Sequence, residues 1–291
     1  MVDLLVERET FGHGGNQEVV RPFAAAGDVE LLLVTPQMQS FEAGKKAEAG
    51  EVPLSEEDVP HWDDDFPFWQ STTVELEGRT VSFQRIVMPM IENDEDMANW
   101  LDSVAVDAVV CSGSRRNVSM WEDWMAPTAS LVRASANAGR PTLGICFGHQ
   151  LLCHALGAII ERADSLSSGI WDLDFTEIGV DDELLTSHVS DDSCVAGLFT
   201  HQDHVMSVPE SCSLLCSTSH NGVTAVRVLS EDGEPLPSWG IQFHPEAARA
   251  RIERAHEWGH ISDEELASFK GEHDGASILS SFATAVGRYQ A

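Results

Sequence analysis

Basic residues are scarce in this sequence. Its 291 residues include 48 Asp and Glu but only 17 Lys and Arg, which gives a formal net charge of −31. Only three of the basic residues are lysines (Lys45, Lys46 and Lys270). A protein that binds nucleic acid needs a basic surface to neutralise phosphates. We therefore expect no nucleic-acid partner.

The shortage of lysine among so many carboxylates is typical of proteins that work in concentrated salt. Salt screens the repulsion between carboxylates, and the acidic groups keep the protein surface hydrated. We expect the protein to be more stable in molar KCl than at low salt. Thermal unfolding across this range of KCl tests the expectation, and an unchanged melting temperature would contradict it.

The sequence also lacks a long apolar run and a paired cysteine motif. No stretch approaches the 18 or so apolar residues that a membrane span needs, and the opening MVDLLVERE carries acids where a secretory leader carries bases. These features predict a soluble, cytoplasmic protein without membrane contact. Six cysteines without a CxxC pair argue against a disulfide framework or a zinc knuckle. Five are expected to be small buried hydrophobic residues: Cys111, Cys153, Cys194, Cys212 and Cys216.

Short apolar runs alternate with helical patterns in the first half of the chain. Strands are expected at 29–35, 107–111 and 141–145, and helices from Asn93 to Asp102, at 121–138 with an interruption near Pro127, and at 147–156. This alternation predicts parallel βαβ units and a sheet covered by helices on both faces. Further strands are expected at 74–87, broken at Glu77-Gly78, and at 170–180, 213–217, 223–229 and 238–243, before two closing helices.

Composition suggests how the chain is divided. Residues 1–28 show no clean period and are expected to be an N-terminal extension. Residues 29–250 are expected to form one α/β domain, and 251–291 a helical extension. Within the domain, the acidic segment 41–70 is rich in aromatics, Pro and Gly. We expect this insertion to be a solvated surface loop, with a lid or a partner-docking element as the alternatives.

One cysteine, Cys146, stands in a distinctive motif, Gly-Ile-Cys-Phe-Gly-His-Gln at 144–150. It lies between a predicted strand and a predicted helix, with glycines two residues before and after it. A sharp turn at this position would crowd the backbone, and glycine removes the Cβ atoms that would collide. The N-terminus of the following helix favours thiolate over thiol, and the N–H of Phe147 is placed to stabilise an oxyanion.

A second motif, Gly-Ile-Gln-Phe-His-Pro-Glu at 240–246, offers a base for this thiol. Pro245 restricts the backbone of His244, and Glu246 can accept the other ring N–H of His244. A nucleophile, a base and a group that orients the base are the parts that cysteine acyl chemistry needs. The two motifs can meet if both follow neighbouring parallel strands, because their carboxyl ends share one edge of the sheet.

Together and in this order, the two motifs resemble the class I glutamine amidotransferase family. The resemblance implies a three-layer, flavodoxin-like α/β fold with a mixed, largely parallel central sheet, and a Cys146–His244–Glu246 triad. It also implies an oxyanion hole formed by Phe147 and by Gly113 of the Cys-Ser-Gly-Ser loop at 111–114.

By the same resemblance, Gln150 lines a glutamine pocket, and Gln202 and Asp203 border the substrate. The implied reaction is hydrolysis of the γ-amide of L-glutamine through a cysteinyl thioester, without a cofactor. The ammonia would pass to an acceptor on a separate synthetase subunit.

Other interpretations remain open. Gamma-glutamyl peptidases share the fold and the triad but release an amine from a γ-glutamyl compound. A non-catalytic regulatory relative is a further alternative. His256-Glu257-Trp258-Gly259-His260 matches the HExxH pattern of zinc proteases, although no third ligand is indicated. His201, Asp203 and His204 could form a metal cluster, but we favour a polar loop beside the substrate and expect no metal.

Overall fold

The computed structural model describes most of the chain. The described residues are 1–2, 16–36, 72–114, 116–185, 195–247, 252–253, 256–257, 262–269 and 271–289. The predicted insertion at 41–70 lies outside these ranges, as do Cys194 and most of residues 1–15. The predicted division at residues 28 and 250 stays a prediction.

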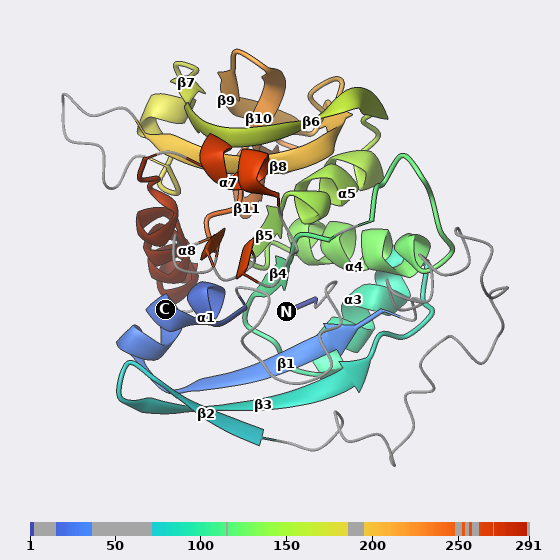
Figure 1. Cartoon of the computed structure of the whole chain (residues 1–291). Coiled ribbons are helices and arrows are strands. Elements are labelled where there is room, and N and C mark those ends of the chain that lie inside the picture. The colour runs from blue at the N-terminus through green and yellow to red at the C-terminus, as the bar shows by residue number, and fades with distance from the viewer. Residues whose placement is uncertain are drawn as a thin grey trace, which may run out of the picture.

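A mixed sheet forms the centre of the molecule (Figure 1). Its strands follow the order β2-β3-β1 and β4-β5-β11-β10-β9-β7, and Val2 joins the two parts by bridging Val34 of β1 and Cys111 of β4. Pairing is parallel for β1–β3, β4–β5 and β5–β11, and antiparallel towards both ends. The bounds are β1 Val29–Thr35, β2 Thr72–Leu76, β3 Arg79–Val87, β4 Val109–Cys111, β5 Thr142–Ile145, β7 Asp174–Phe175, β9 Cys212–Thr218, β10 Asn221–Leu229 and β11 Pro235–Ile241.

Helices cover both faces of this sheet, which completes three layers (Figure 1). Helices α3 (Asp94–Ser103), α4 (Met125–Asn137) and α5 (Phe147–Ala155) pack on one face, and α8 (Gly275–Tyr289), with α1 (Asn16–Ala26) beside it, packs on the other. Strand alternation explains the two apolar layers: Val109 and Cys111 of β4 join the cluster around α3–α5, whereas Val110 joins the cluster around α8. The predicted α/β fold with a mixed, largely parallel sheet is confirmed.

Two further strands form an antiparallel ribbon beside the main sheet. They are β6 (Ile160–Asp172) and β8 (Ala196–Val205), and the short helix α7 (Asp263–Ser268) contacts β6. The predicted strand at 170–180 was misplaced, because β6 ends at Asp172 and a 3₁₀ helix, η3, occupies Gly179–Asp181. The predicted loop at 201–205 is also wrong, since these residues belong to β8. Both strands contain many polar residues, so neither shows a buried apolar run.

Local signals predicted the helix and turn boundaries with two exceptions. Asn93 caps α3 by accepting hydrogen bonds from the N–H groups of residues 95 and 96, and Glu77-Gly78 forms the expected turn with positive φ at both residues. Helix α4, however, begins at Met125, and Pro127 does not interrupt it, because the first helical turn needs no N–H donor there. Helix α1 was not expected.

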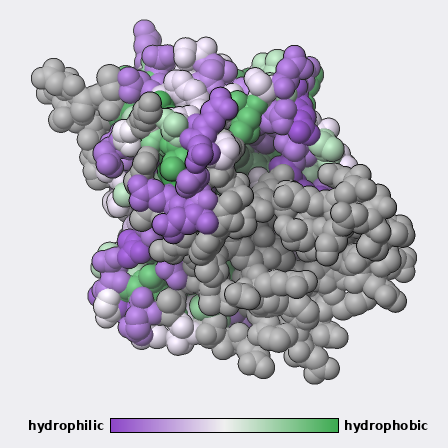
Figure 2. Space-filling view, in the orientation of Figure 1, coloured by the Kyte–Doolittle hydropathy of each residue, from purple (hydrophilic) through white to green (hydrophobic). Residues whose placement is uncertain are grey.

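The coloured part of the surface in Figure 2, which excludes the grey residues, is mostly hydrophilic, with small hydrophobic areas between purple ones. Among the described residues, no helix has the length and apolar character needed to cross a membrane.

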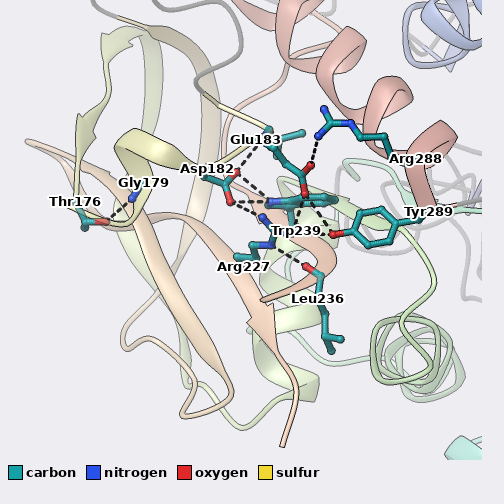
Figure 3. Close-up of polar contacts among 10 residues, drawn as sticks. Thr176, Gly179, Asp182, Glu183, Arg227, Leu236, Trp239, Arg288 and Tyr289 are labelled. Atoms are coloured by element: carbon teal, nitrogen blue, oxygen red, sulfur yellow. Dashed lines mark hydrogen bonds and ion pairs between the residues drawn. The ribbon is translucent and has the colours of Figure 1, made fainter. Parts of the chain in front are cut away.

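A buried ion cluster anchors the last helix to the sheet (Figure 3). Arg227 of β10 donates to Asp182 at 3.1 Å and to Glu183 at 2.8 Å, and its guanidinium lies 4.7 Å from the ring centroid of Trp239. Trp239 also donates to Asp182, and Glu183 accepts a hydrogen bond from Arg288 of α8. The Asp182 side chain is only 2% exposed, so hydrogen bonds from Arg227 and Trp239 replace the contacts with water that its carboxylate lacks.

Replacing Arg227 by Met is expected to lower the free energy of unfolding by about 3–5 kcal/mol, because the carboxylate of Asp182 would stay buried without its cation. Arg288→Met is the matched control, since its side chain is 57% exposed and binds the same Glu183. That pair is expected to contribute less than about 1 kcal/mol. Urea unfolding followed by tryptophan fluorescence measures both variants, and equal effects would contradict the prediction.

Candidate active site

Cys146 sits at a strained turn between β5 and α5. Its backbone has φ 50° and ψ −100°, and the residue is 5% exposed. A Cβ on Gly144 would lie 2.5 Å from the carbonyl oxygen of Gly148, and one on Gly148 would lie 2.2 Å from that of Cys111. Only glycine fits at both positions, as the sequence motif predicts.

Strand pairing brings the second motif to the same edge. Strands β5 and β11 are parallel with Ile145 opposite Ile241, and the N–H of Cys146 donates to the carbonyl of Ile241 at 2.8 Å. The residues that follow each strand therefore emerge side by side, at the carboxyl ends where open α/β sheets hold their sites. The N–H of His244 donates to the carbonyl of Leu198 at 2.7 Å, which ties this segment to β8.

His244 lies between Glu246 and Cys146. Its Nδ1 is 2.8 Å from Oε1 of Glu246, a residue that is 7% exposed. Burial by itself would lower the pKa of His244, but the nearby negative charges of Cys146 and Glu246 outweigh burial and raise this pKa well above its ordinary value. This environment favours the protonated, imidazolium form of His244.

The loop after β4 closes the other side of the sulfur. A Cβ at Gly113 would lie 2.8 Å from Cε1 of His244 and 3.8 Å from Cβ of Cys146, so glycine lets the loop approach both side chains. Among the described residues, no hydrogen-bond partner is found for the N–H groups of Gly113 and Phe147. Two free donors beside the sulfur are the feature that an oxyanion hole requires.

These residues line one pocket of about 380 Å³. The residues predicted from sequence that border it are Gly113, Cys146, Phe147, Gln150, Gln202, Asp203, His244 and Glu246. Arg162 and Thr200 also line it and were not predicted. They come from β6 and β8, the two strands whose sequences carry no clear apolar pattern, so no sequence signal pointed to them.

The three predicted substrate-binding side chains already have protein partners. Gln150 donates to the carbonyl of Asp203 at 2.9 Å and to the side chain of Gln242 at 3.1 Å. The carboxylate of Asp203 accepts two hydrogen bonds from Ser119, from its N–H at 2.8 Å and from its hydroxyl at 2.7 Å. Asp203 thus fixes the loop that carries Gly113, a link between segments that the sequence did not reveal.

Gln202 is held in a similar way at the edge of the pocket. Its side-chain N–H donates to the carbonyl of Ala163 at 2.9 Å, and its Oε1 accepts from Arg162 at 2.8 Å.

The alternative metal sites gain no support from the described part of the chain. It contains no cluster of three or more His, Cys, Asp or Glu side chains arranged for a metal ion. Burial lowers the pKa of His201 to about 3, which keeps its ring neutral, and its Nδ1 hydrogen-bonds the carbonyl of Asp203. In the HExxH segment, His256 contacts Asp263 at 2.7 Å, whereas residues 258–260 lie outside the description.

Comparison with known proteins identifies the family. The model described as "Glutamine amidotransferase class-I" matches residues 72–255, more than half of the chain. The chain belongs to the class I glutamine amidotransferase family. The matched region contains all three residues of the predicted triad, Cys146, His244 and Glu246.

Curated relatives of this chain include two kinds of enzyme, a gamma-glutamyl peptidase and a GMP synthase subunit. Gamma-glutamyl peptidase 3 of Arabidopsis thaliana is 30% identical over 173 residues, covering 58% of this chain and 64% of its own length. The glutamine-hydrolyzing GMP synthase subunit of Methanocaldococcus jannaschii is 33% identical over 114 residues, covering 38% of this chain and 54% of its own. The matched regions thus span less than two thirds of these relatives.

A solved structure has the same overall fold. A glutamine amidotransferase from Thermotoga maritima superposes with a TM-score of 0.53 at 14% identity, covering 89% of this chain and 99% of that one.

Proposed function

We propose that this glutamine amidotransferase hydrolyses the γ-amide of L-glutamine with a Cys146–His244–Glu246 triad. The observation that carries the proposal is the convergence of a sulfur at a strained strand–helix turn with an imidazole that is hydrogen-bonded to a buried glutamate. The chain order Cys, His, Glu and the match to the family model support the same assignment.

The reaction begins with attack of the Cys146 thiolate on the carbonyl carbon of the γ-amide. The N–H groups of Gly113 and Phe147 stabilise the resulting oxyanion. His244, as imidazolium, gives its proton to the departing nitrogen, so the C–N bond breaks and ammonia leaves a cysteinyl thioester. His244 then takes a proton from water, which attacks the thioester and releases glutamate and the thiolate. No step needs a cofactor.

The ammonia would be used by an acceptor enzyme on a separate polypeptide. The Methanocaldococcus relative is by name one subunit of a glutamine-hydrolyzing synthase, which supports a partner synthetase for this chain as well. A pull-down at high salt that recovers an ATP-dependent synthetase is the expected result of a search for this partner.

Gamma-glutamyl peptidase activity is the second candidate, because the Arabidopsis peptidase matches a longer part of the chain than the GMP synthase relative does. The two activities share the acyl half of the substrate and differ only in the leaving group. Ammonia release from L-glutamine should exceed cleavage of a γ-glutamyl dipeptide by at least about tenfold in kcat/KM, roughly 1.4 kcal/mol in transition-state binding. Faster cleavage of the dipeptide would assign the chain to the peptidases.

A further inference from the structure

The charged side chains that line the active-site pocket differ in their protein partners. Both carboxylate oxygens of Asp203 accept hydrogen bonds from Ser119, and Glu246 is bonded to His244. Arg116 forms an ion pair with the carboxylate of Glu122 at 3.5 Å. Arg162 is the remaining charged side chain of the pocket, and it forms no ion pair with any described residue.

An arginine that forms no ion pair with a carboxylate is unusual among the described residues of this protein. Every other arginine whose side chain the structure describes forms an ion pair, namely Arg21, Arg79, Arg116, Arg133, Arg140, Arg227 and Arg288. With a net charge of −31, acidic partners are plentiful. Arg162 is therefore the exception among these side chains, and it lies at the active-site pocket.

The surroundings hold Arg162 at this place. Arg162 lies opposite Asp203 in the β6–β8 register, and its Nη2 donates to Oε1 of Gln202 at 2.8 Å. Its Nη1 contacts Sδ of Met120. Since a guanidinium has five N–H donors and no acceptor, three donors remain for a ligand that offers oxygen atoms.

The position of Gln202, the partner of Arg162, relative to Sγ of Cys146 suits the α-carboxylate of a γ-glutamyl substrate. The carbonyl oxygen of Thr200 is 3.9 Å from Sγ of Cys146, and Gln202 follows two residues later on the same half-exposed face of β8. Two strand residues span about 7 Å. This is similar to the reach of an extended γ-glutamyl group from its reacting carbonyl to its α-carboxylate.

We propose that Arg162, oriented by Gln202, binds the α-carboxylate of the γ-glutamyl substrate. This inference rests on the proposed function, and it applies to glutamine and to γ-glutamyl peptides alike because both carry this group. The planar guanidinium can bind a carboxylate through two parallel hydrogen bonds. A local cation would also offset the repulsion that a strongly acidic protein exerts on an anionic group.

Alkylation of Cys146 in the full chain tests this role without requiring turnover. The probe 6-diazo-5-oxo-L-norleucine is an electrophile that carries the α-carboxylate of glutamine, whereas iodoacetamide is an electrophile without one. Arg162→Gln is expected to slow labelling by the diazo compound about 10- to 100-fold, the loss typical of a hydrogen bond to a charged group. Labelling by iodoacetamide should stay within about twofold of wild type, because the thiolate itself is unchanged.

Arg79→Gln is the matched control. It removes the same charge, but Arg79 belongs to the edge pair β2–β3 and binds the exposed Asp28. Neither labelling rate should change in this variant. All rates are measured at one salt concentration, since salt screens the interaction. The KM for glutamine should rise in Arg162→Gln more than kcat falls.

Three results would overturn the assignment. Equal slowing of both reagents would mean that Arg162 only maintains the shape of the pocket. No slowing with the diazo compound, together with poorer cleavage of a γ-glutamyl dipeptide, would move the bound carboxylate to the leaving amine. Wild-type protein that reacts with iodoacetamide but not with the diazo compound would instead refute the proposed glutamine chemistry, and the inference with it.

Discussion

Replacement of Cys146 by Ala is expected to reduce ammonia release from L-glutamine by at least about 10⁴-fold. The substitution removes the atom that forms the thioester, and water alone cannot replace it within the pocket. The melting temperature should stay close to that of wild type, because only one sulfur atom is lost and alanine has the same Cβ that the turn with φ 50° already accommodates in cysteine. Ammonia release under substrate saturation and thermal unfolding measure the two effects.

Cys153→Ala supplies the control for this experiment. Cys153 lies on the same helix α5 and is fully buried, and burial raises the pKa of its thiol well above the ordinary value. Such a thiol is inert as a nucleophile. We expect this variant to keep its activity even if its stability falls. Turnover retained by Cys146→Ala, or lost in the control at unchanged folding, would contradict the assignment of the nucleophile.

Glu246→Gln is expected to lower kcat/KM by about 10²- to 10⁴-fold, as removal of the orienting carboxylate does in comparable triads. An amide can still contact Nδ1 of His244, but it carries no charge to stabilise the imidazolium. Thiol alkylation by iodoacetamide should also slow, because fewer molecules would hold the thiolate–imidazolium pair. A kcat/KM within a few-fold of wild type would exclude Glu246 from the triad.

The pH dependence supplies a more specific test of the same residue. The raised pKa of His244 keeps the ring protonated above its ordinary value, so activity that needs the imidazolium declines only when the pH rises through the raised pKa. Glu246→Gln removes one of the two charges that raise it, and the alkaline limb should move to lower pH. Glu177→Gln, an exposed change, should leave the profile in place.

The free energy of unfolding should also decrease as the pH rises through the raised pKa of His244. A pKa that is higher in the folded than in the unfolded state stabilises the fold fully below the unfolded pKa, near 6.5. This contribution is lost as the pH rises through the folded value. Wild type should therefore lose stability at alkaline pH, and Glu246→Gln should lose less of it.

Much of the fold could be predicted from local patterns. The cap of α3 at Asn93 and the turn at Glu77-Gly78 depend on hydrogen bonds and backbone angles within a few residues. The sequence alone therefore predicts both correctly. The boundaries of β1 and β5 follow from short apolar runs, and the start of α5 follows from the glycine-flanked turn at Cys146. Strands β6 and β8 were misjudged because they form a partly exposed ribbon, in which pairing rather than burial sets the structure. The fold of α1 likewise depends on its packing against α8.

The sequence by itself determined which side chains could take part in the chemistry. Glycine spacing around Cys146, and Pro245 between His244 and Glu246, follow from steric limits that any fold must respect. Only the tertiary structure decided that Arg162 reaches the same pocket and that Asp203 holds the Gly113 loop through Ser119. Those contacts join segments separated by about 40 to 84 residues. Their formation depends on strand register and on the closure of the whole sheet, which no local pattern encodes.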